Sequence, residues 1–192
     1  MATSGLTRYR DKRSAHSTPE PFSRLTIPAT GKLFVVQQHN ARQLHFDLRL
    51  EIDGVLRSWA VPRGPSADPN DKRFAALVED HPLDYADFEG RIPEGNYGAG
   101  NVIVWDRGTW TPLNNVREGF RKGKLLFELN GFKLHGRWTL VRMKSKDKQA
   151  DSDWLLIKER DQWVEQPGSF TNESVLSGLT LDEMDTPSRQ LN

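Results

Sequence analysis

The sequence predicts a mainly β fold, a small closed antiparallel β-barrel with one or two short helices. The first observation is a strict alternation of polar and apolar side chains over residues 45–52, which puts the apolar ones on a single face of a strand. The second is a pair of tight-hairpin signals, Asp53-Gly54 and Asn130-Gly131, each between strand-like runs. Many short antiparallel strands with few helices form barrels or closed sandwiches, so we expect a barrel.

The predicted elements follow one another at short intervals. The apolar runs predict strands at residues 33–38, 44–52, 55–61, 73–79, 101–106, 109–112, 124–129, 132–143 and 153–159. One helix is predicted at about residues 114–122, because Val116 and Phe120 share a face and Gly123 supplies a stop. These elements leave both ends of the chain outside the predicted barrel.

The two ends of the chain are polar. The sequence predicts three regions. They are a flexible basic arm at residues 1–27, the barrel domain at residues 28–165 and a polar tail at residues 166–192. Residues 1–49 hold eight Lys or Arg against three Asp or Glu, although the net charge of the whole chain is only +1. This asymmetry favours an anionic partner for the first quarter of the chain.

Composition excludes several classes of protein. The chain has no cysteine, so it can form neither a disulfide framework nor a thiolate metal site. This composition is compatible with a reducing cytoplasm. No apolar stretch approaches the roughly 20 residues that a membrane-spanning helix needs, and the N-terminus lacks a signal-peptide core. We therefore expect a soluble cytoplasmic protein.

Two histidines and an aspartate are the most informative residues. His45, Asp47 and Arg49 alternate on the polar face of their strand. If residues 33–38 form the hairpin partner, His39 lies opposite His45, with Cβ atoms about 5 Å apart. Two imidazoles and a carboxylate suit a divalent ion such as Mn, Fe or Zn and leave positions open for substrate. Because Arg grips phosphate oxygens, the pattern favours phosphate chemistry.

The structural alternative is that these are ordinary half-exposed strand residues. That explanation suits one isolated residue, whereas three on one face beside an arginine favour a site. The apolar face of the strand, which holds Phe46 and Leu48, is separate from the polar one. The sequence therefore also predicts that removing Asp47 would change stability little.

Other residues have both a chemical and a structural interpretation. His81 follows an apolar strand, and it has three interpretations: a scaffold residue, a fourth metal ligand, or a cation or acid facing a leaving oxygen. Arg63 lies in a proline-rich turn that either only turns the chain or fixes a phosphate-binding cation. Turn geometry and packing explain the glycine-rich residues 91–100. The six tryptophans lie within strand patterns and suit a core better than base-stacking platforms.

Four motifs, taken together and in order, resemble the 3′-phosphoesterase family. This family is the module fused to polymerase and ligase domains in bacterial ATP-dependent DNA ligase D, and it is also found as a free-standing protein. The motifs are His39 with His45-Phe46-Asp47-Leu48-Arg49-Leu50, Trp59-Ala60-Val61-Pro62-Arg63-Gly64-Pro65-Ser66, Glu79-Asp80-His81-Pro82-Leu83-Asp84-Tyr85 and Ile92-Pro93-Glu94-Gly95-Asn96-Tyr97-Gly98. The resemblance covers roughly residues 8–160.

The resemblance implies an Mn²⁺-dependent enzyme, with Co²⁺ or Zn²⁺ as substitutes. Such an enzyme removes a 3′-terminal ribonucleoside from a primer strand and then the remaining 3′-phosphate, which leaves a 3′-hydroxyl for repair and end joining. By resemblance the metal ligands are His39, His45 and Asp47. The catalytic positions are Arg49, Glu79, His81 and Tyr85, and the phosphate-binding positions are Arg13, Glu20, Arg49, Arg63 and Arg73.

The chain departs from the family pattern at a few positions. Ser14 and Ala15 stand where the family's arm has Asp and Phe, so the contribution of that acidic residue is weaker or is supplied otherwise. Arg63 stands in place of a lysine, which keeps the charge and changes its reach.

The resemblance also implies partners. They are the 3′ ends of DNA or DNA–RNA primer-templates and a DNA ligase acting in trans, since neither a ligase lysine motif nor a polymerase domain fits in the remaining length. We expect a monomer without a membrane partner, located in the cytoplasm with the nucleoid.

Two other functions remain open from the residues alone. A non-haem Fe(II) oxygenase would use His45, Asp47 and His81 as a facial triad inside a barrel. A non-catalytic nucleic-acid-binding barrel would need aromatic platforms on an exposed sheet face, where this sequence has His, Asp and Arg instead.

Overall fold

The computed structural model describes residues 6–14, 17–21, 32–144, 152–165 and 169–185. The strands of this part of the chain are β1 (Lys32–Asn40), β2 (Leu44–Ile52), β3 (Val55–Val61), β4 (Lys72–Leu77), β5 (Gly90–Ile92), β6 (Gly100–Pro112), β7 (Lys124–Gly131), β8 (His135–Arg142) and β9 (Asp153–Lys158). The helices are α1 (Thr7–Asp11), α2 (Val116–Lys122), and the 3₁₀ turns η1 (Leu83–Asp87) and η3 (Glu183–Asp185).

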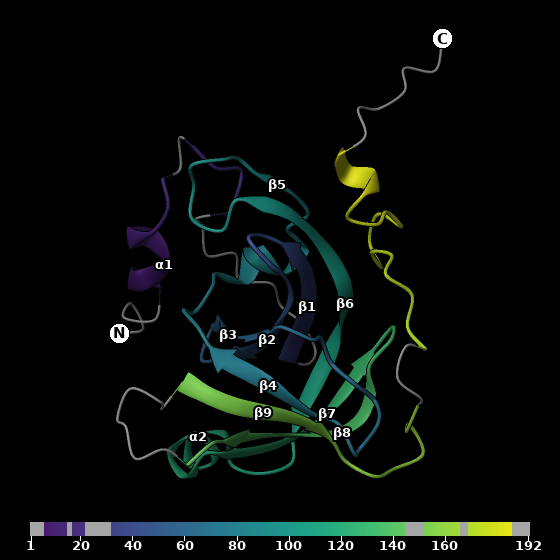
Figure 1. Ribbon diagram of the computed structural model, residues 1–192. Coiled ribbons are helices and arrows are strands. Elements are labelled where there is room, and N and C mark those ends of the chain that lie inside the picture. The colour runs from purple at the N-terminus through teal and green to yellow at the C-terminus, as the bar shows by residue number, and fades with distance from the viewer. Residues whose placement is uncertain (1–5, 15–16, 22–31, 145–151, 166–168, 186–192) are drawn as a thin grey trace.

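The strands close into an antiparallel barrel, as the sequence predicts (Figure 1). The order around the barrel is β1-β2-β3-β4-β9-β8-β7-β6, and a second pairing of β1 with β6 closes the ring. The short strand β5 pairs with β6 beyond this ring. A closed ring leaves no exposed hydrogen-bonding edge, which stabilises a small all-β protein.

One of the two hairpin signals is confirmed and the other is wrong. Asp53 and Gly54 join β2 to β3 with φ angles of 51° and 78°, as a tight primed turn requires. Asn130 and Gly131, in contrast, are still part of β7, and the turn comes after them. The turn lies there because the backbone amides of residues 132–134 donate to the buried carboxylate of Asp106.

Further differences concern element boundaries. The two strands predicted at residues 101–106 and 109–112 are one continuous strand, β6. The predicted helix is confirmed, with the Asn115 side chain accepting from the amide of Glu118 and Gly123 in the left-handed region at φ 72°. The alternation pattern did not reveal β5 or α1, because each spans five residues or fewer.

Apolar side chains form two clusters, one on each face of the β1–β2 hairpin. The barrel interior holds Phe34, Leu48, Leu50 and the large indole of Trp59, which confirms the predicted apolar face of β2. The second cluster covers the outer face of β1, β3 and β6, and its members are Tyr9, Val35, Leu56, Leu83, Tyr85, Ala86, Phe88, Ile92, Val102 and Val104. Arg49 on β2 therefore lies under a cover that comes from α1 and η1, with the Tyr85 ring over its guanidinium.

The described parts of both chain ends pack on the barrel, which differs from the predicted arm and tail. In the arm, Tyr9 is buried and its hydroxyl donates to the carbonyl of Pro21 at 2.8 Å. In the tail, the amide of Val175 donates to the carbonyl of Val104 at 2.9 Å. A few apolar side chains and backbone hydrogen bonds suffice to fix such polar segments. Residues 1–5, 15–16, 22–27, 166–168 and 186–192 lie outside the described residues, and the domain boundaries remain predictions.

Among the described helices, none has the length and apolar character that crossing a membrane requires.

Candidate metal centre and its supporting network

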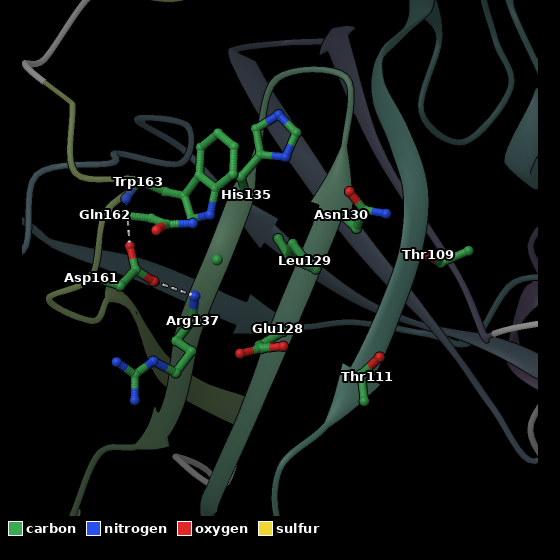
Figure 2. Close-up of a pocket in the computed structure, with 11 residues that line it drawn as sticks. Thr109, Thr111, Glu128, Leu129, Asn130, His135, Arg137, Asp161, Gln162 and Trp163 are labelled. Atoms are coloured by element: carbon green, nitrogen blue, oxygen red, sulfur yellow. Dashed lines mark hydrogen bonds between the residues drawn. The ribbon is translucent and has the colours of Figure 1, made fainter.

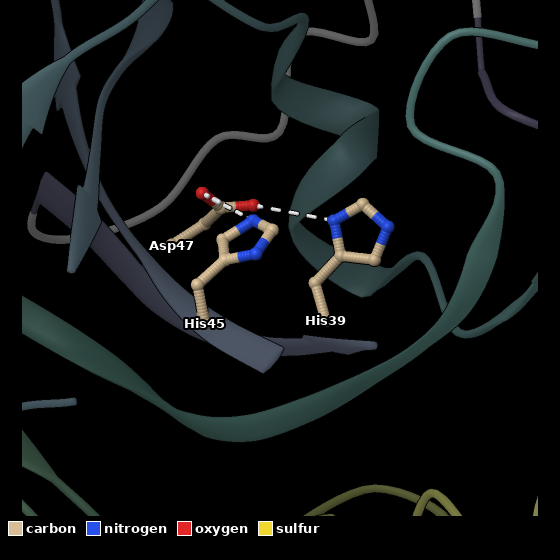
Figure 3. Close-up of side chains that lie close together, drawn as sticks. All are labelled: His39, His45 and Asp47. Carbon is tan, nitrogen blue, oxygen red and sulfur yellow. Dashed lines mark ion pairs between the residues drawn. The ribbon is translucent and has the colours of Figure 1, made fainter. Parts of the chain in front are cut away.

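The β1–β2 hairpin brings the three predicted ligands together. Its register pairs His39 with His45, as the sequence predicts, and their ring centroids lie 4.8 Å apart. Asp47 follows two residues later on the same face of β2, and the strand alternation keeps its carboxylate on the side of the two imidazoles. Figure 3 shows both rings turned toward the carboxylate of Asp47. One donor atom from each residue lies within 4.8 Å of the other two.

Backbone carbonyls fix the orientation of both imidazoles. His39 Nε2 lies 2.8 Å from the carbonyl oxygen of Gly98, and His45 Nδ1 lies 3.0 Å from that of Gln43. A carbonyl only accepts, so each of these nitrogens carries the proton in the neutral ring. The remaining lone pairs, on His39 Nδ1 and His45 Nε2, face Asp47 at 3.9 and 3.6 Å. Metal-binding histidines in proteins are held in this way.

The pKa shifts of the two imidazoles have opposite directions, and the carboxylate stays charged. Burial lowers the pKa of His39, and the charge of Asp47 offsets this only in part. Burial acts in the same direction on His45, but its contact with Asp47 outweighs burial and raises the pKa of this imidazole. Burial alone would raise the pKa of Asp47, whereas Arg49 and then the two histidines hold it well below its usual range. A permanent carboxylate charge therefore lies between two imidazoles.

Arg49 connects this cluster to the rest of the site. Its guanidinium is buried and donates to Asp47 Oδ2 at 2.9 Å and to Gln37 Oε1 at 2.7 Å. Its Nη1 also contacts Ser58 Oγ at 2.9 Å and His81 Nδ1 at 3.0 Å. These contacts occupy most of the five N–H groups of a guanidinium. The described contacts hold Arg49 against Asp47, and the phosphate clamp that the sequence predicts at Arg49 stays a prediction.

His81 is buried and lies beside Arg49 rather than in the histidine cluster. Its backbone pairs with Leu56, and its Nδ1 lies near both Arg49 and the carbonyl of Glu79. Burial first, and then the charges of Arg49 and Arg13, hold the pKa of His81 well below 6.5. The imidazole is therefore neutral at neutral pH. The structure does not bring His81 to His45 and Asp47, either as a fourth ligand or as an oxygenase triad, because the donor cluster contains His39 instead. The lowered pKa disfavours the predicted cationic role.

Four of the residues assigned by resemblance form a second buried group behind His81. Arg13 Nε pairs with Glu20 Oε1 at 2.7 Å, and Arg13 Nη1 with Glu79 Oε1 at 3.3 Å. The Tyr85 hydroxyl donates to Glu20 Oε1 at 3.0 Å, and its ring lies against His81 with a centroid separation of 4.7 Å. The structure thus brings the arm residues to the β-barrel site through charge pairing.

The two remaining predicted phosphate contacts lie elsewhere. Arg63 is exposed in the turn directly after β3, and the pairing of Phe46 with Val61 puts this turn beside the His45 end of β2. Arg73 lies on β4 and pairs with Asp71 at 2.8 Å. Strand alternation gives it the same face as Ala75, in the barrel interior, which is opposite to the face of Asp47. The prediction for Arg73 is therefore not supported by the geometry.

Sequence reasoning missed several supporting residues. Gln37 is fully buried, and its amide nitrogen donates to the carbonyls of Tyr85 and Phe88 while its oxygen accepts from Arg49. Ser58 is the register partner of Arg49 and contacts its guanidinium. A glutamine and a serine within apolar strands were the available signals, because a buried polar group needs a partner.

A groove also lies on the outer face of β6, β7 and β8 (Figure 2). It is lined by Thr109, Glu128 and His135, and Asp161 and Trp163 form one wall. His135 stacks on Trp163 with a centroid separation of 4.5 Å. Since none of the predicted site residues lines this groove, we assign no function to it.

The fold and the donor cluster define a β-barrel protein with a candidate His–His–Asp metal centre. Residues 37–142 match the family model described as the DNA Ligase D 3′-phosphoesterase domain, so the chain belongs to this family. It is 58% identical over 183 residues to the "Multifunctional non-homologous end joining protein LigD" of Pseudomonas aeruginosa. It is 40% identical over 168 residues to the "Multifunctional non-homologous end joining DNA repair protein LigD" of Mycobacterium tuberculosis.

These matches cover most of this chain but a small part of the relatives. The Pseudomonas match includes 92% of this chain and 22% of the relative, and the Mycobacterium match 87% and 21%. The chain thus spans about a fifth of the length of these relatives. The family resemblance stated from the motifs is confirmed.

Proposed function

We propose that this protein is a metal-dependent DNA 3′-end-healing phosphoesterase of end joining. It would remove a 3′-terminal ribonucleoside and then the 3′-phosphate from a primer strand, leaving a 3′-hydroxyl. The observation that carries the proposal is the pair of imidazoles, each tied to a backbone carbonyl by one nitrogen and facing the buried Asp47 with the other. Membership of the 3′-phosphoesterase family supports the reaction class.

The donor set fits Mn²⁺ as the native ion, with Co²⁺ or Zn²⁺ as substitutes. Two imidazoles and one carboxylate are ligands that all three ions accept, and three protein ligands leave positions open. When bound, such an ion supplies Lewis-acid polarisation of a phosphoryl oxygen. A cysteine nucleophile is excluded because the chain has no cysteine.

The surrounding residues have two kinds of role in this proposal. Arg49 holds Asp47 in its ligand position, and the neutral His81 and Gln37 in turn orient the guanidinium. Arg63 is exposed beside the His45 end of β2, where it can meet an incoming phosphate. We retain Glu79 and Tyr85 as catalytic-site residues that act through this network rather than by direct proton transfer.

We further propose the partners that this chemistry requires. The substrate is the 3′ end of a DNA or DNA–RNA primer-template, and the 3′-hydroxyl produced is the group that a DNA ligase joins. We therefore propose that a DNA ligase acting in trans uses this 3′-hydroxyl in the next step. We also propose that the protein is a monomer and works in the cytoplasm at the nucleoid.

The test uses a primer strand ending in one ribonucleotide on a DNA template. With Mn²⁺ we expect conversion to a 3′-phosphate strand and then to a 3′-hydroxyl strand, seen as two successive products on a sequencing gel. His45→Ala should abolish both products, whereas Gln43→Ala should not, because only the backbone carbonyl of Gln43 holds His45. Product formation in excess chelator, or an active His45→Ala variant, would contradict the proposal.

A further inference from the structure

Tyr97 is an exposed aromatic residue next to the candidate metal centre. It lies in the loop between β5 and β6, and 51% of its surface is accessible. The next residue, Gly98, provides the carbonyl that accepts from His39 Nε2. A side chain at Gly98 would lie 3.4 Å from the His39 ring, so the loop backbone packs directly on this imidazole. In the chain, Tyr97 therefore directly precedes the residue that contacts the candidate ligand His39.

The arm holds this loop in place from the other side. Lys12 Nζ lies 4.2 Å from the centroid of the Tyr97 ring, and Arg13 Cζ lies 5.4 Å from it. Ser17 and Asn96 exchange two hydrogen bonds, at 2.6 and 3.0 Å. Cations over an aromatic ring fix its orientation. The ring is thus pre-oriented while half of its surface remains free.

We propose that Tyr97 is the stacking platform for the terminal nucleobase of the strand whose 3′ end enters the candidate metal centre. This inference rests on the proposed function. A 3′-phosphate at the metal ligands brings its own nucleoside to the rim of the site, where Tyr97 offers an exposed ring. Bases of every sequence stack on aromatic side chains through their π faces. Tyr97 would therefore give the enzyme affinity for the last base without selecting its identity.

The alternative is that Tyr97 only supports Lys12 and Arg13. Both explanations predict lower activity when Tyr97 is removed, but they differ in how the loss depends on the substrate. A platform matters only when a base is present. A support for the arm matters equally with and without a base.

The experiment compares two oligonucleotides with a 3′-phosphate, one ending in adenosine and the other in an abasic residue. Tyr97→Ala and Tyr97→Leu should lower kcat/KM for the adenosine end by about 5- to 100-fold, the range that base stacking contributes. The abasic end should change less than about twofold, and Tyr97→Phe should retain activity on both ends because it keeps the ring. Phe132→Ala, which removes an exposed aromatic side chain from the β7–β8 turn, is the matched control.

A binding measurement separates this inference from the proposed function. A terminal 2-aminopurine changes its fluorescence when it stacks. The titration uses a strand with a non-hydrolysable 3′-phosphonate and Mn²⁺ present, so that the end can bind at the metal centre without turnover. We expect wild-type protein to change the emission and Tyr97→Leu to lose that change. Equal losses on adenosine and abasic ends, or an unchanged emission response in Tyr97→Leu, would overturn the role of Tyr97. Absence of phosphate release by wild type would refute the proposed function, and the fluorescence result would still decide the role of Tyr97.

Discussion

Replacing Asp47 with alanine should destabilise the protein even when no metal is present. The carboxylate is buried and forms a 2.9 Å ion pair with the buried guanidinium of Arg49. Alanine would leave that charge without its counterion, although Gln37, Ser58 and His81 would still contact it. This expectation differs from the one drawn from the strand pattern, in which removal of Asp47 changes stability little.

The expected loss of stability can be calculated because both members of the ion pair are buried. Removing one member of a buried ion pair costs about 3–5 kcal/mol, because the remaining charge is uncompensated. For a protein of 150–250 residues, about 2–4 °C in Tm corresponds to each kcal/mol, so the expected decrease is roughly 6–20 °C. Asp47→Ala combined with Arg49→Met should recover part of this loss, because it removes the uncompensated charge. Gln43→Ala, at an exposed position of the same hairpin, should leave Tm unchanged.

The assay is urea unfolding in excess chelator at several pH values. The pKa of Asp47 is lowered in the folded protein, so its contribution is fully present above the ordinary value of 3.8 and is lost as the pH falls through the lower folded value. The part of the difference between wild type and Asp47→Ala that comes from the pair with Arg49 should stay constant from pH 7 to 5 and narrow only below pH 3.8. Asp47 also raises the pKa of His45, so the total difference should grow as the pH falls from 7 to 5 and His45 becomes protonated. A difference below about 1 kcal/mol at pH 7 would refute the buried-pair argument.

Three further predictions concern the network, the arm and the exposed turn. His81→Ala should lower kcat more than it raises KM, because His81 orients Arg49 rather than binding substrate, and a change in KM alone would refute this role. Glu20→Gln should release the arm, because it removes the charge that pairs with Arg13, and trypsin should then cut the arm faster than in wild type. An unchanged cleavage rate would show that other contacts hold the arm. Arg63→Ala should weaken DNA binding and reduce the slope of log K against log salt by about 0.7–0.9, and an unaltered slope would exclude a phosphate contact.

The donor cluster could be predicted from the sequence because it depends on short-range geometry. His45 and Asp47 share a face by strand alternation alone, and a hairpin of ordinary length brings His39 opposite His45. Much of the barrel was predictable for the same reason, since β1–β2–β3 and β6–β7–β8–β9 pair in chain order. The pairings of β1 with β6 and of β4 with β9, which close the ring, join strands that are far apart in the chain.

The environment of Arg49 could not be predicted in this way. Alternation correctly gives its face, but that face is covered by α1 and η1, whose positions depend on long-range packing of Tyr9 and Tyr85. A residue that looks exposed in the strand pattern is therefore buried. For Arg73 the difficulty is in the family-based assignment. The resemblance makes Arg73 a phosphate-binding residue, whereas β4 places it on the face of the barrel interior, opposite to the face of Asp47.

The backbone groups that orient the site residues could not be predicted from the sequence either. The carbonyls of Gly98 and Gln43 fix the two imidazoles, and no side-chain identity specifies them. The glycine-rich loop could be interpreted only as a turn until its contact with His39 was known. Similarly, the turn after Gly131 depends on Asp106 of a neighbouring strand rather than on its own residues.

Direct titration of Mn²⁺ into the protein tests the central claim, that His39, His45 and Asp47 form a metal centre. Calorimetry on wild type, His45→Ala and Gln43→Ala at neutral pH measures the affinity without any assumption about the reaction. We expect one site in wild type and Gln43→Ala, and at least a tenfold lower affinity in His45→Ala, which loses one imidazole ligand but keeps the Asp47–Arg49 pair. Equal affinity in all three proteins would contradict the assignment of the metal to this cluster.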